Sequence, residues 1–344
     1  MTSVKTFRIE EEPTYDELGS GTFIFSDDYS VFDWGKMPDP IPDKGASLCI
    51  MGAHNFELME EVGMPTHYEG VVVDGETVRL EDLDPASLES PPREMAIGVT
   101  RVPELPYENG SYDYESYHDE FGPNFFIPLE IVYRNQVPVG SSLRRRTDPR
   151  DYGLNYDEWP DEDLILDEPI IEFSTKLETQ DRYLSREEAD EVAGFPPIEK
   201  LDAVAKSVNR LLTEQAKAQG FVHQDGKMEC FMYRGEIFVA DVVGTFDENR
   251  YTYNGQQVSK EVIRQYHQRT QPDWVEAVSI AKAEANERGV ADWKSLCELE
   301  PQPLNDDVIQ LARDLYCAGT NAYTGKQWFD APPLDAVLDD VRNL

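Results

Sequence analysis

Residues 225–250, DGKMECFMYRGEIFVADVVGTFDENR, carry most of the side chains that could do chemistry. Side chains alternate along a strand, so Lys227 and Glu229 share one face. Asp241 follows on the returning strand of a predicted hairpin at 227–243 with Arg234-Gly235 near its tip. A three-residue loop would place Glu229 opposite Asp241, whereas a two-residue loop would put them on opposite faces.

In the first of these registers, two carboxylates and one ammonium group converge. Carboxylate oxygens are hard ligands that suit Mg²⁺, and a nearby lysine suits the phosphates of a nucleotide. The pattern therefore predicts Glu229 and Asp241 as metal ligands in a magnesium–ATP site. An ordinary charged hairpin face in solvent is the alternative, and the pattern by itself leaves both open.

A second candidate is the segment 125–146, in which an apolar strand ends at Arg134. A Gly-Ser-Ser turn with Ser141 and Ser142 follows, and then three consecutive arginines at 144–146. Guanidinium groups, hydroxyls and free backbone amides could together hold a phosphate. Surface arginines paired with the abundant carboxylates are the alternative.

Further candidates lie at 17–45 and 168–181. Gly19 and Gly21 stand between strand-like segments and would allow a phosphate to approach the backbone, but two glycines alone are weak evidence and an ordinary turn is favoured. Asp33 and Lys36 follow, and an isolated Lys176 comes after an apolar strand.

The charge of the chain limits the class of partner. Its 344 residues include 31 basic and 68 acidic side chains, a net charge of −37. Such a field repels nucleic acids and anionic membranes, but it permits small phosphorylated ligands in a local basic pocket. Short carboxylates and only twelve lysines are typical of adaptation to a salt-rich cytoplasm.

The sequence lacks the motifs that mark several other kinds of active site. The four cysteines form no CxxC pair, and the five histidines show no HExxH or triad spacing. No nucleophile elbow, Walker loop or Rossmann fingerprint appears. Without an apolar leader or an apolar run of about 18 residues, the sequence predicts a soluble, cytoplasmic protein with free thiols.

The elements that would position these residues follow from periodicity and turn signals. The N-terminal part is predicted to be β-rich, with strands at 20–35, 95–102 and 125–134, a helix at 46–62 and a hairpin at 71–80. Acidic segments 107–122 and 147–163 show neither period and are predicted to be solvated loops or insertions, with a lid over a site as the alternative. Helices are predicted at 196–220, 259–269, 272–289 and within 305–344.

Taken in order, these stretches resemble the SAICAR synthetase (phosphoribosylaminoimidazole-succinocarboxamide synthase) family from about residue 17 to about residue 270. The family's PxExxxR…GS element resembles Pro128, Glu130, Arg134, Gly140 and Ser141, and its DxKxE element resembles Asp225, Lys227 and Glu229. SDDYSVFDWGK and EVGMPTH (61–67) resemble two further family segments.

The resemblance implies an α+β, two-lobed, ATP-grasp-like fold. Residues 1–135 would form a small β-rich lobe over the nucleotide, 136–300 a larger α+β lobe with substrate and metal carboxylates, and 301–344 a helical extension. The implied reaction condenses carboxyaminoimidazole ribonucleotide with L-aspartate as ATP becomes ADP and phosphate, through an acyl phosphate, in purine biosynthesis.

The resemblance also implies a role for each matching position. Glu229 and Asp241 would hold Mg²⁺, and Lys227, Asp33 and Lys36 would lie nearest the reaction. ATP would contact a set of eight residues: Gly19, Ser20, Gly21, Phe126, Lys176, Lys227, Glu229 and Asp241. Arg134, Arg250 and one or both of Ser141 and Ser142 would bind the ribonucleotide.

The chain also departs from the family pattern. Ser20 and Thr22 stand where the family's glycine-rich loop carries lysines, so phosphate contact there would depend on backbone amides and hydroxyls. Val242 stands where the family often has an acid.

Two other functions are consistent with the same residues. A related ATP-dependent kinase or ligase would act on another phosphorylated substrate, without dependence on aspartate. A non-catalytic acidic binding protein would bind cations weakly and show no saturable ATP site. The sequence leaves the oligomeric state open, with a homo-oligomer among the options.

Overall fold

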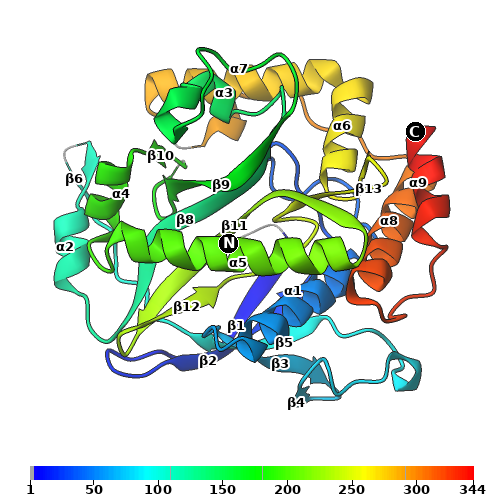
Figure 1. Ribbon diagram of the computed structural model, residues 1–344, viewed down its shortest axis with the longest axis horizontal. Helices are drawn as coiled ribbons and strands as arrows, with labels where there is room; N and C mark the ends of the chain where they lie inside the picture. The colour runs from blue at the N-terminus through cyan, green and yellow to red at the C-terminus, as the bar shows by residue number, and fades with distance from the viewer. Residues whose placement is uncertain (1–3, 109, 180, 291) are drawn as a thin grey trace.

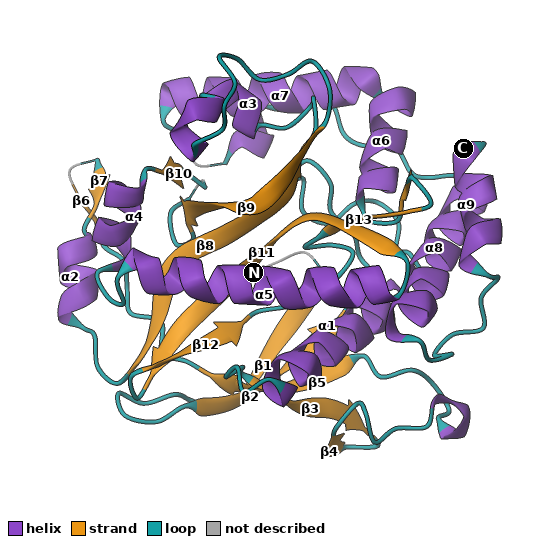
Figure 2. Ribbon diagram, in the orientation of Figure 1, coloured by secondary structure: helices purple, strands orange, loops and turns teal. Residues whose placement is uncertain are grey.

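Two antiparallel sheets form the framework of the computed structural model, which describes residues 4–108, 110–179, 181–290 and 292–344. The first sheet has the order β1-β2-β5-β3-β4 (Figure 2). Its strands are β1 (Lys5–Glu11), β2 (Gly19–Phe25), β3 (Tyr68–Val73), β4 (Glu76–Val78) and β5 (Glu94–Val99). The predicted 71–80 hairpin is confirmed, because Val73 pairs with Glu76 across the Asp74-Gly75 turn.

The second sheet has the order β10-β9-β8-β11-β13-β14, with β12 also paired to β11. Its strands are β8 (Asn124–Val137), β9 (Leu164–Thr175), β10 (Tyr183–Leu184), β11 (Phe221–Tyr233), β12 (Glu236–Ala240), β13 (Arg250–Tyr253) and β14 (Gln256–Gln257). The two longest strands, β8 and β11, are paired, and they carry the candidate residues Phe126, Arg134, Lys227 and Glu229.

Helix α5 (Ile198–Ala218) crosses one face of the second sheet, as Figure 1 shows. Its apolar residues recur at helical spacing, and Leu201, Ala205, Val208 and Leu212 are buried against the sheet. The predicted helix at 196–220 is thereby confirmed. Helices α6 (Glu261–Thr270) and α7 (Pro272–Arg288) follow β14 in the chain, and both lie close to their predicted bounds.

The C-terminal residues fold as α8 (Asp306–Thr324) and α9 (Leu334–Arg342), and α8 packs against α1 (Lys44–Glu61) (Figure 1). Buried Ser47 of α1 and Thr320 of α8 share a hydrogen bond of 2.6 Å. The two lobes and the mixture of sheets and helices confirm the predicted α+β fold. Among the described residues, every helix is too short or too polar to span a bilayer.

Two details of the predicted organisation need correction. The boundary placed at residue 135 falls inside β8, all of whose strand partners belong to the second sheet. The acidic segment 107–122 is not wholly loop, because it contains the strands β6 (Tyr107–Glu108) and β7 (Ser111–Tyr112) and helix α2 (Tyr114–Asp119). Buried Tyr117 anchors that helix by donating a hydrogen bond to the Phe126 carbonyl at 2.9 Å.

The acidic segment 147–163 is closer to its prediction. It is irregular apart from one 3₁₀ turn at Pro149–Tyr152, which Asp148 caps.

Candidate functional site

The hairpin of β11 and β12 has a two-residue turn, Arg234-Gly235, so Glu229 pairs with Ala240 and not with Asp241. The three-residue register is therefore wrong. Asp241 nevertheless turns back towards Glu229, because it leaves the strand with a left-handed φ of 62°. The two carboxylates are close enough for the charge of Asp241 to raise the pKa of Glu229.

Each of these carboxylates has a lysine partner. Lys176 lies 2.5 Å from Glu229, and Lys5 forms an ion pair with Asp241. Burial and the neighbouring Asp241 raise the pKa of Glu229 to about 7. Burial also opposes ionisation of Asp241, but Lys5 and Lys176 outweigh it and lower the pKa of Asp241 to about 2.

Glu130, on β8, joins this cluster to Lys227. The Lys227 ammonium lies 2.7 Å from Glu130 and 3.1 Å from Glu248, and Lys176 lies 3.6 Å from Glu130. These carboxylates raise the pKa of Lys227 although burial opposes the charge. The sequence-predicted Lys176, Lys227, Glu229 and Asp241 therefore meet in one cluster, which also includes Glu130 and Glu248.

The cluster suits a divalent cation that binds together with phosphate. Within the described ranges, no group of three or more His, Cys, Asp or Glu side chains has a metal-binding arrangement. The protein therefore offers a pair of carboxylates and no complete cage. Mg²⁺ is commonly held by one or two carboxylates plus substrate phosphates and water, so Glu229 and Asp241 fit it.

Lys5 is a site residue that the sequence reasoning missed. Its ammonium reaches Asp241 from β1 and also lies 4.7 Å from the centre of the Phe23 ring. Its side chain is only 8% exposed, which is low for a lysine in a chain of this charge. The scarcity of lysines was the one signal available, but nothing in the sequence placed residue 5 beside residue 241.

Gly19, Ser20 and Gly21 do not form the expected open loop. They lie in β2, where all three pair with β5 and Ser20 and Gly21 also pair with β1. These residues are therefore part of a strand and not of an open loop, and their predicted contact with ATP phosphates stays a prediction. Phe126 packs with Leu18, Leu177 and Phe231 in a small apolar cluster at the start of β8.

Arg134 and Arg250 meet at a shared carboxylate. Arg134 lies 3.2 Å from Asp225, and the Arg250 Nε donates to the same carboxylate at 2.8 Å. Burial opposes ionisation of Asp225, but Arg250 and Arg134 hold its pKa below the ordinary value. Arg134 also forms an ion pair with Glu172 at 2.5 Å. The two arginines that were predicted to bind the ribonucleotide therefore lie close to each other.

The Gly-Ser-Ser turn is less open than predicted. Ser141 is buried and its hydroxyl accepts a hydrogen bond from the Leu143 backbone at 3.3 Å, whereas Ser142 is half-buried. Arg144 does not take part in a phosphate cradle, because it donates to the backbone carbonyls of Val137 at 2.6 Å and Glu162 at 2.7 Å. It fastens the acidic segment 147–163 to the second sheet.

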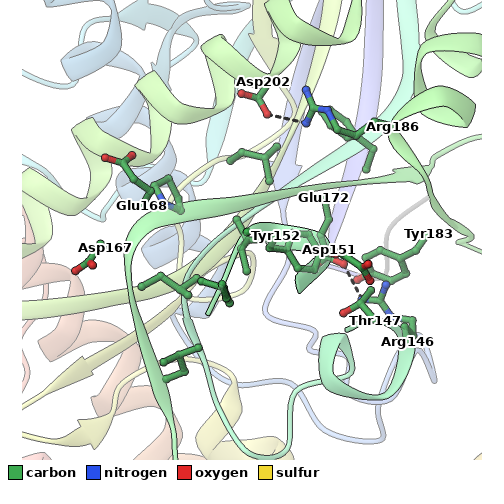
Figure 3. A pocket seen from close by; sticks show the side chains of 18 of the residues that line it. Arg146, Thr147, Asp151, Tyr152, Asp167, Glu168, Glu172, Tyr183, Arg186 and Asp202 are labelled. Carbon is green, nitrogen blue, oxygen red and sulfur yellow. Dashed lines mark hydrogen bonds and ion pairs between the residues drawn. The ribbon is translucent and has the colours of Figure 1, made fainter. Parts of the chain in front are cut away.

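A cavity of about 1120 Å³ lies between β9, residues 151–156 and the region of Arg186 and Asp202 (Figure 3). Glu172 lines it and contacts both Arg134 and Arg146, the latter at 2.9 Å. The guanidinium of Arg146 is stacked 3.5 Å from the centre of the Tyr183 ring. No sequence pattern indicated this cavity, because it forms between segments distant in the chain.

Asp33 and Lys36 have different surroundings from the main cluster. Asp33 has a left-handed φ of 57° and forms an ion pair with Lys282 of α7 at 2.5 Å. Lys36 is exposed and lies 3.0 Å from Asp28. The structure does not bring this pair together, and their predicted role near the reacting groups stays a prediction.

The two sheets, with clustered lysines and carboxylates where β8, β11 and β12 meet, define a two-lobed α+β protein. A family model described as SAICAR synthetase matches residues 13–116 and 124–280. The chain belongs to the SAICAR synthetase family.

Relatives support this assignment along the whole chain. The chain is 39% identical over 352 residues to a protein of Archaeoglobus fulgidus, covering 100% of this chain and 99% of the relative. It is 31% identical to phosphoribosylaminoimidazole-succinocarboxamide synthase of Thermoplasma volcanium, over 91% of this chain and 96% of that protein.

Solved structures share the fold. SAICAR synthase from Saccharomyces cerevisiae, complexed with SAICAR, aligns with a TM-score of 0.62 at 18% identity, over 96% of this chain and 95% of that one. A SAICAR synthetase in complex with ADP aligns with a TM-score of 0.52 at 22% identity, over 88% of this chain and 99% of that one.

Proposed function

We propose that this chain condenses carboxyaminoimidazole ribonucleotide with L-aspartate at the expense of ATP, forming the succinocarboxamide ribonucleotide, ADP and phosphate. Its family makes it a ligase that forms a C–N bond in purine biosynthesis. The observation that carries the assignment of the site is the meeting of Glu229 and Asp241 beside Lys5, Lys176 and Lys227.

In this proposal Glu229 and Asp241 hold Mg²⁺, which when bound neutralises phosphate charge. The three lysines share the same task from the protein side, since each ammonium already lies within ion-pair distance of a cluster carboxylate. A triphosphate that arrives with Mg²⁺ would exchange these carboxylate contacts for contacts with phosphate oxygens. The apolar cluster around Phe126 is the proposed place of the adenine.

Arg134 and Arg250 are proposed to bind the phosphate of the ribonucleotide. Asp225 keeps both guanidinium groups in place through its two oxygens, so the arginines are oriented before the ligand arrives. Planar guanidinium groups bind phosphate through paired hydrogen bonds, which fixes the orientation of the ribonucleotide.

The proposed chemistry has two steps. The substrate carboxylate attacks the γ-phosphorus of ATP and forms an acyl phosphate with release of ADP. The amine of L-aspartate then attacks the acyl carbon, phosphate leaves, and the amine proton is lost to solvent. A free carboxylate is a poor electrophile. Its phosphorylation provides a good leaving group, so the amine can attack the acyl carbon and form the amide bond. Positioning and charge neutralisation by the protein supply the catalysis.

A coupled assay for ADP release tests this function. ATP, Mg²⁺, the ribonucleotide and L-aspartate are mixed with enzyme at high salt, because the acidic surface suggests that the enzyme works in a salt-rich cytoplasm. We expect turnover that requires all four components and that falls to background in Glu229→Ala. ADP release independent of aspartate would instead indicate a kinase, and turnover equal to that of Glu229→Ala would refute the assignment.

A further inference from the structure

The turn that contains His67 joins the two sheets immediately beside Asp241. Within it, the Pro65 carbonyl accepts a hydrogen bond from the Val239 backbone at 3.0 Å, and the His67 backbone donates to the Val239 carbonyl at 3.1 Å. The His67 carbonyl in turn accepts from Gly98 of β5 at 2.7 Å. The turn is therefore bonded to β12 of the second sheet on one side and to the first sheet on the other.

Asp241 needs support at this position because its backbone is in an unfavourable conformation. A left-handed φ of 62° is costly for a residue with a Cβ atom. In a continued strand, Asp241 would face away from Glu229, since Glu229 pairs with Ala240 and successive side chains alternate. The left-handed backbone is thus what turns the carboxylate towards Glu229 and Lys5.

The imidazole of His67 supplies that support. Its Nε2 lies 2.9 Å from the backbone carbonyl oxygen of Asp241. A carbonyl only accepts, so Nε2 carries the hydrogen and donates. The ring is buried and fixed edge-on between Phe23 at 5.6 Å and Phe56 at 5.2 Å, centre to centre. A rigidly packed donor therefore meets the carbonyl of the strained residue.

Charged groups on the other packed elements also face this ring. The carboxylate of Asp241 favours a positive charge on His67, whereas Lys5 opposes one. Burial is the largest effect and lowers the pKa of His67 to about 4, so the imidazole stays neutral near pH 7.

We infer that His67 is a positioning residue for the metal-binding carboxylate: its Nε2–H holds the backbone of Asp241 in the left-handed conformation that aims the side chain at Glu229. This inference depends on the proposed function, because it assigns Asp241 to Mg²⁺. His67 itself touches neither substrate nor metal in this account. Its effect should appear in magnesium-dependent nucleotide binding and not in ribonucleotide binding.

Calorimetric titration of the full chain tests this with two variants. His67→Phe keeps an aromatic ring between Phe23 and Phe56 but removes the donor, and His67→Gln keeps a side-chain N–H donor. We expect His67→Phe to weaken binding of Mg²⁺–ADP about tenfold, the range for a buried carbonyl that loses its donor. Binding of the ribonucleotide and of ADP without metal should stay within about twofold of wild type. His67→Gln should recover most of the loss.

Wild-type affinity for Mg²⁺–ADP in His67→Phe would overturn the inference, as would an equal loss of ribonucleotide binding. If that variant does not fold, the unmodified protein supplies the test. Long-range ¹H–¹⁵N correlation of histidine-labelled enzyme should show His67 neutral with hydrogen on Nε2, and a hydrogen on Nδ1 alone would also overturn it.

Asp241→Asn separates the two possible failures. If Asp241→Asn binds Mg²⁺–ADP like wild type, the proposed metal site is wrong. If Asp241→Asn loses affinity and His67→Phe does not, the metal site stands and only the positioning role of His67 falls.

Discussion

The ammonium of Lys176 lies 2.5 Å from the carboxylate of Glu229, yet the pKa of Glu229 is raised to about 7. Burial and the charge of Asp241 together outweigh the attraction of the lysine. Without nucleotide, burial and the neighbouring carboxylate of Asp241 therefore make the negative charge of Glu229 costly. A divalent cation bound to Glu229 would stabilise that charge, so cation binding must compete with protonation of the carboxylate.

This competition makes magnesium-dependent binding sensitive to pH. Glu229 is mostly ionised at pH 8 and mostly protonated at pH 6, because its pKa of about 7 lies between them. A cation binds the ionised form, so we expect the affinity for Mg²⁺–ADP to fall about tenfold from pH 8 to pH 6. Calorimetry at both pH values measures it. Glu229→Gln should bind weakly at both, and a full pH effect in that variant would contradict the prediction.

Lys5 is predicted to contribute to nucleotide binding from the first strand. Replacing it by methionine keeps an unbranched side chain at this position but removes the charge beside Asp241 and Phe23. We expect Lys5→Met to weaken ATP binding by about 10-fold or more, the scale of a charge-assisted hydrogen bond. Equilibrium binding measures the change. Lys217→Met, an exposed change on α5, is the matched control and should bind ATP normally.

Arg134 is predicted to require its guanidinium and not merely its charge. It contacts Glu172 and Asp225 through different nitrogens, and a lysine ammonium cannot span both. We expect Arg134→Lys to raise the KM for the ribonucleotide at least about 10-fold while the KM for ATP changes little. Steady-state kinetics with each substrate varied in turn decides this. An unchanged ribonucleotide KM would refute the contact, and exposed Arg210→Lys serves as the control.

The loop that follows Asp241 is predicted to depend on a buried ion pair. Lys44 of α1 lies 2.7 Å from Asp247, with side chains 0% and 2% exposed, and Tyr316 of α8 donates to the same carboxylate at 2.6 Å. Asp247→Asn leaves the Lys44 charge without a counterion, so we expect a loss of about 3–5 kcal/mol in the free energy of unfolding. Tyr316→Phe removes one hydrogen bond and should cost about 1 kcal/mol.

Denaturant unfolding measures both effects. The double change Lys44→Met with Asp247→Leu removes both charges and should recover much of the loss. An Asp247→Asn protein as stable as wild type would show that the pair does not stabilise this loop.

The predictions that succeeded from sequence were those decided by neighbours in the chain. The helix α5 and the β3–β4 hairpin follow from local periodicity and a turn signal, and both lie where they were expected. The prediction of a loop at Gly19–Gly21 failed because a Gly-Ser-Gly string is compatible with a loop or a strand. Pairing with β1 and β5, which are distant in the sequence, decided between them.

For this protein, residue types and order were enough to reveal the family resemblance, the two carboxylates and the lysines on β11 and after β9. Only the folded chain decided how those carboxylates meet, through a backbone turn at Asp241 in place of a cross-strand pair. It also brought in Lys5, His67 and Glu248. A sequence records which groups exist and their local periodicity, whereas charge interactions depend on distances in space that long-range packing sets.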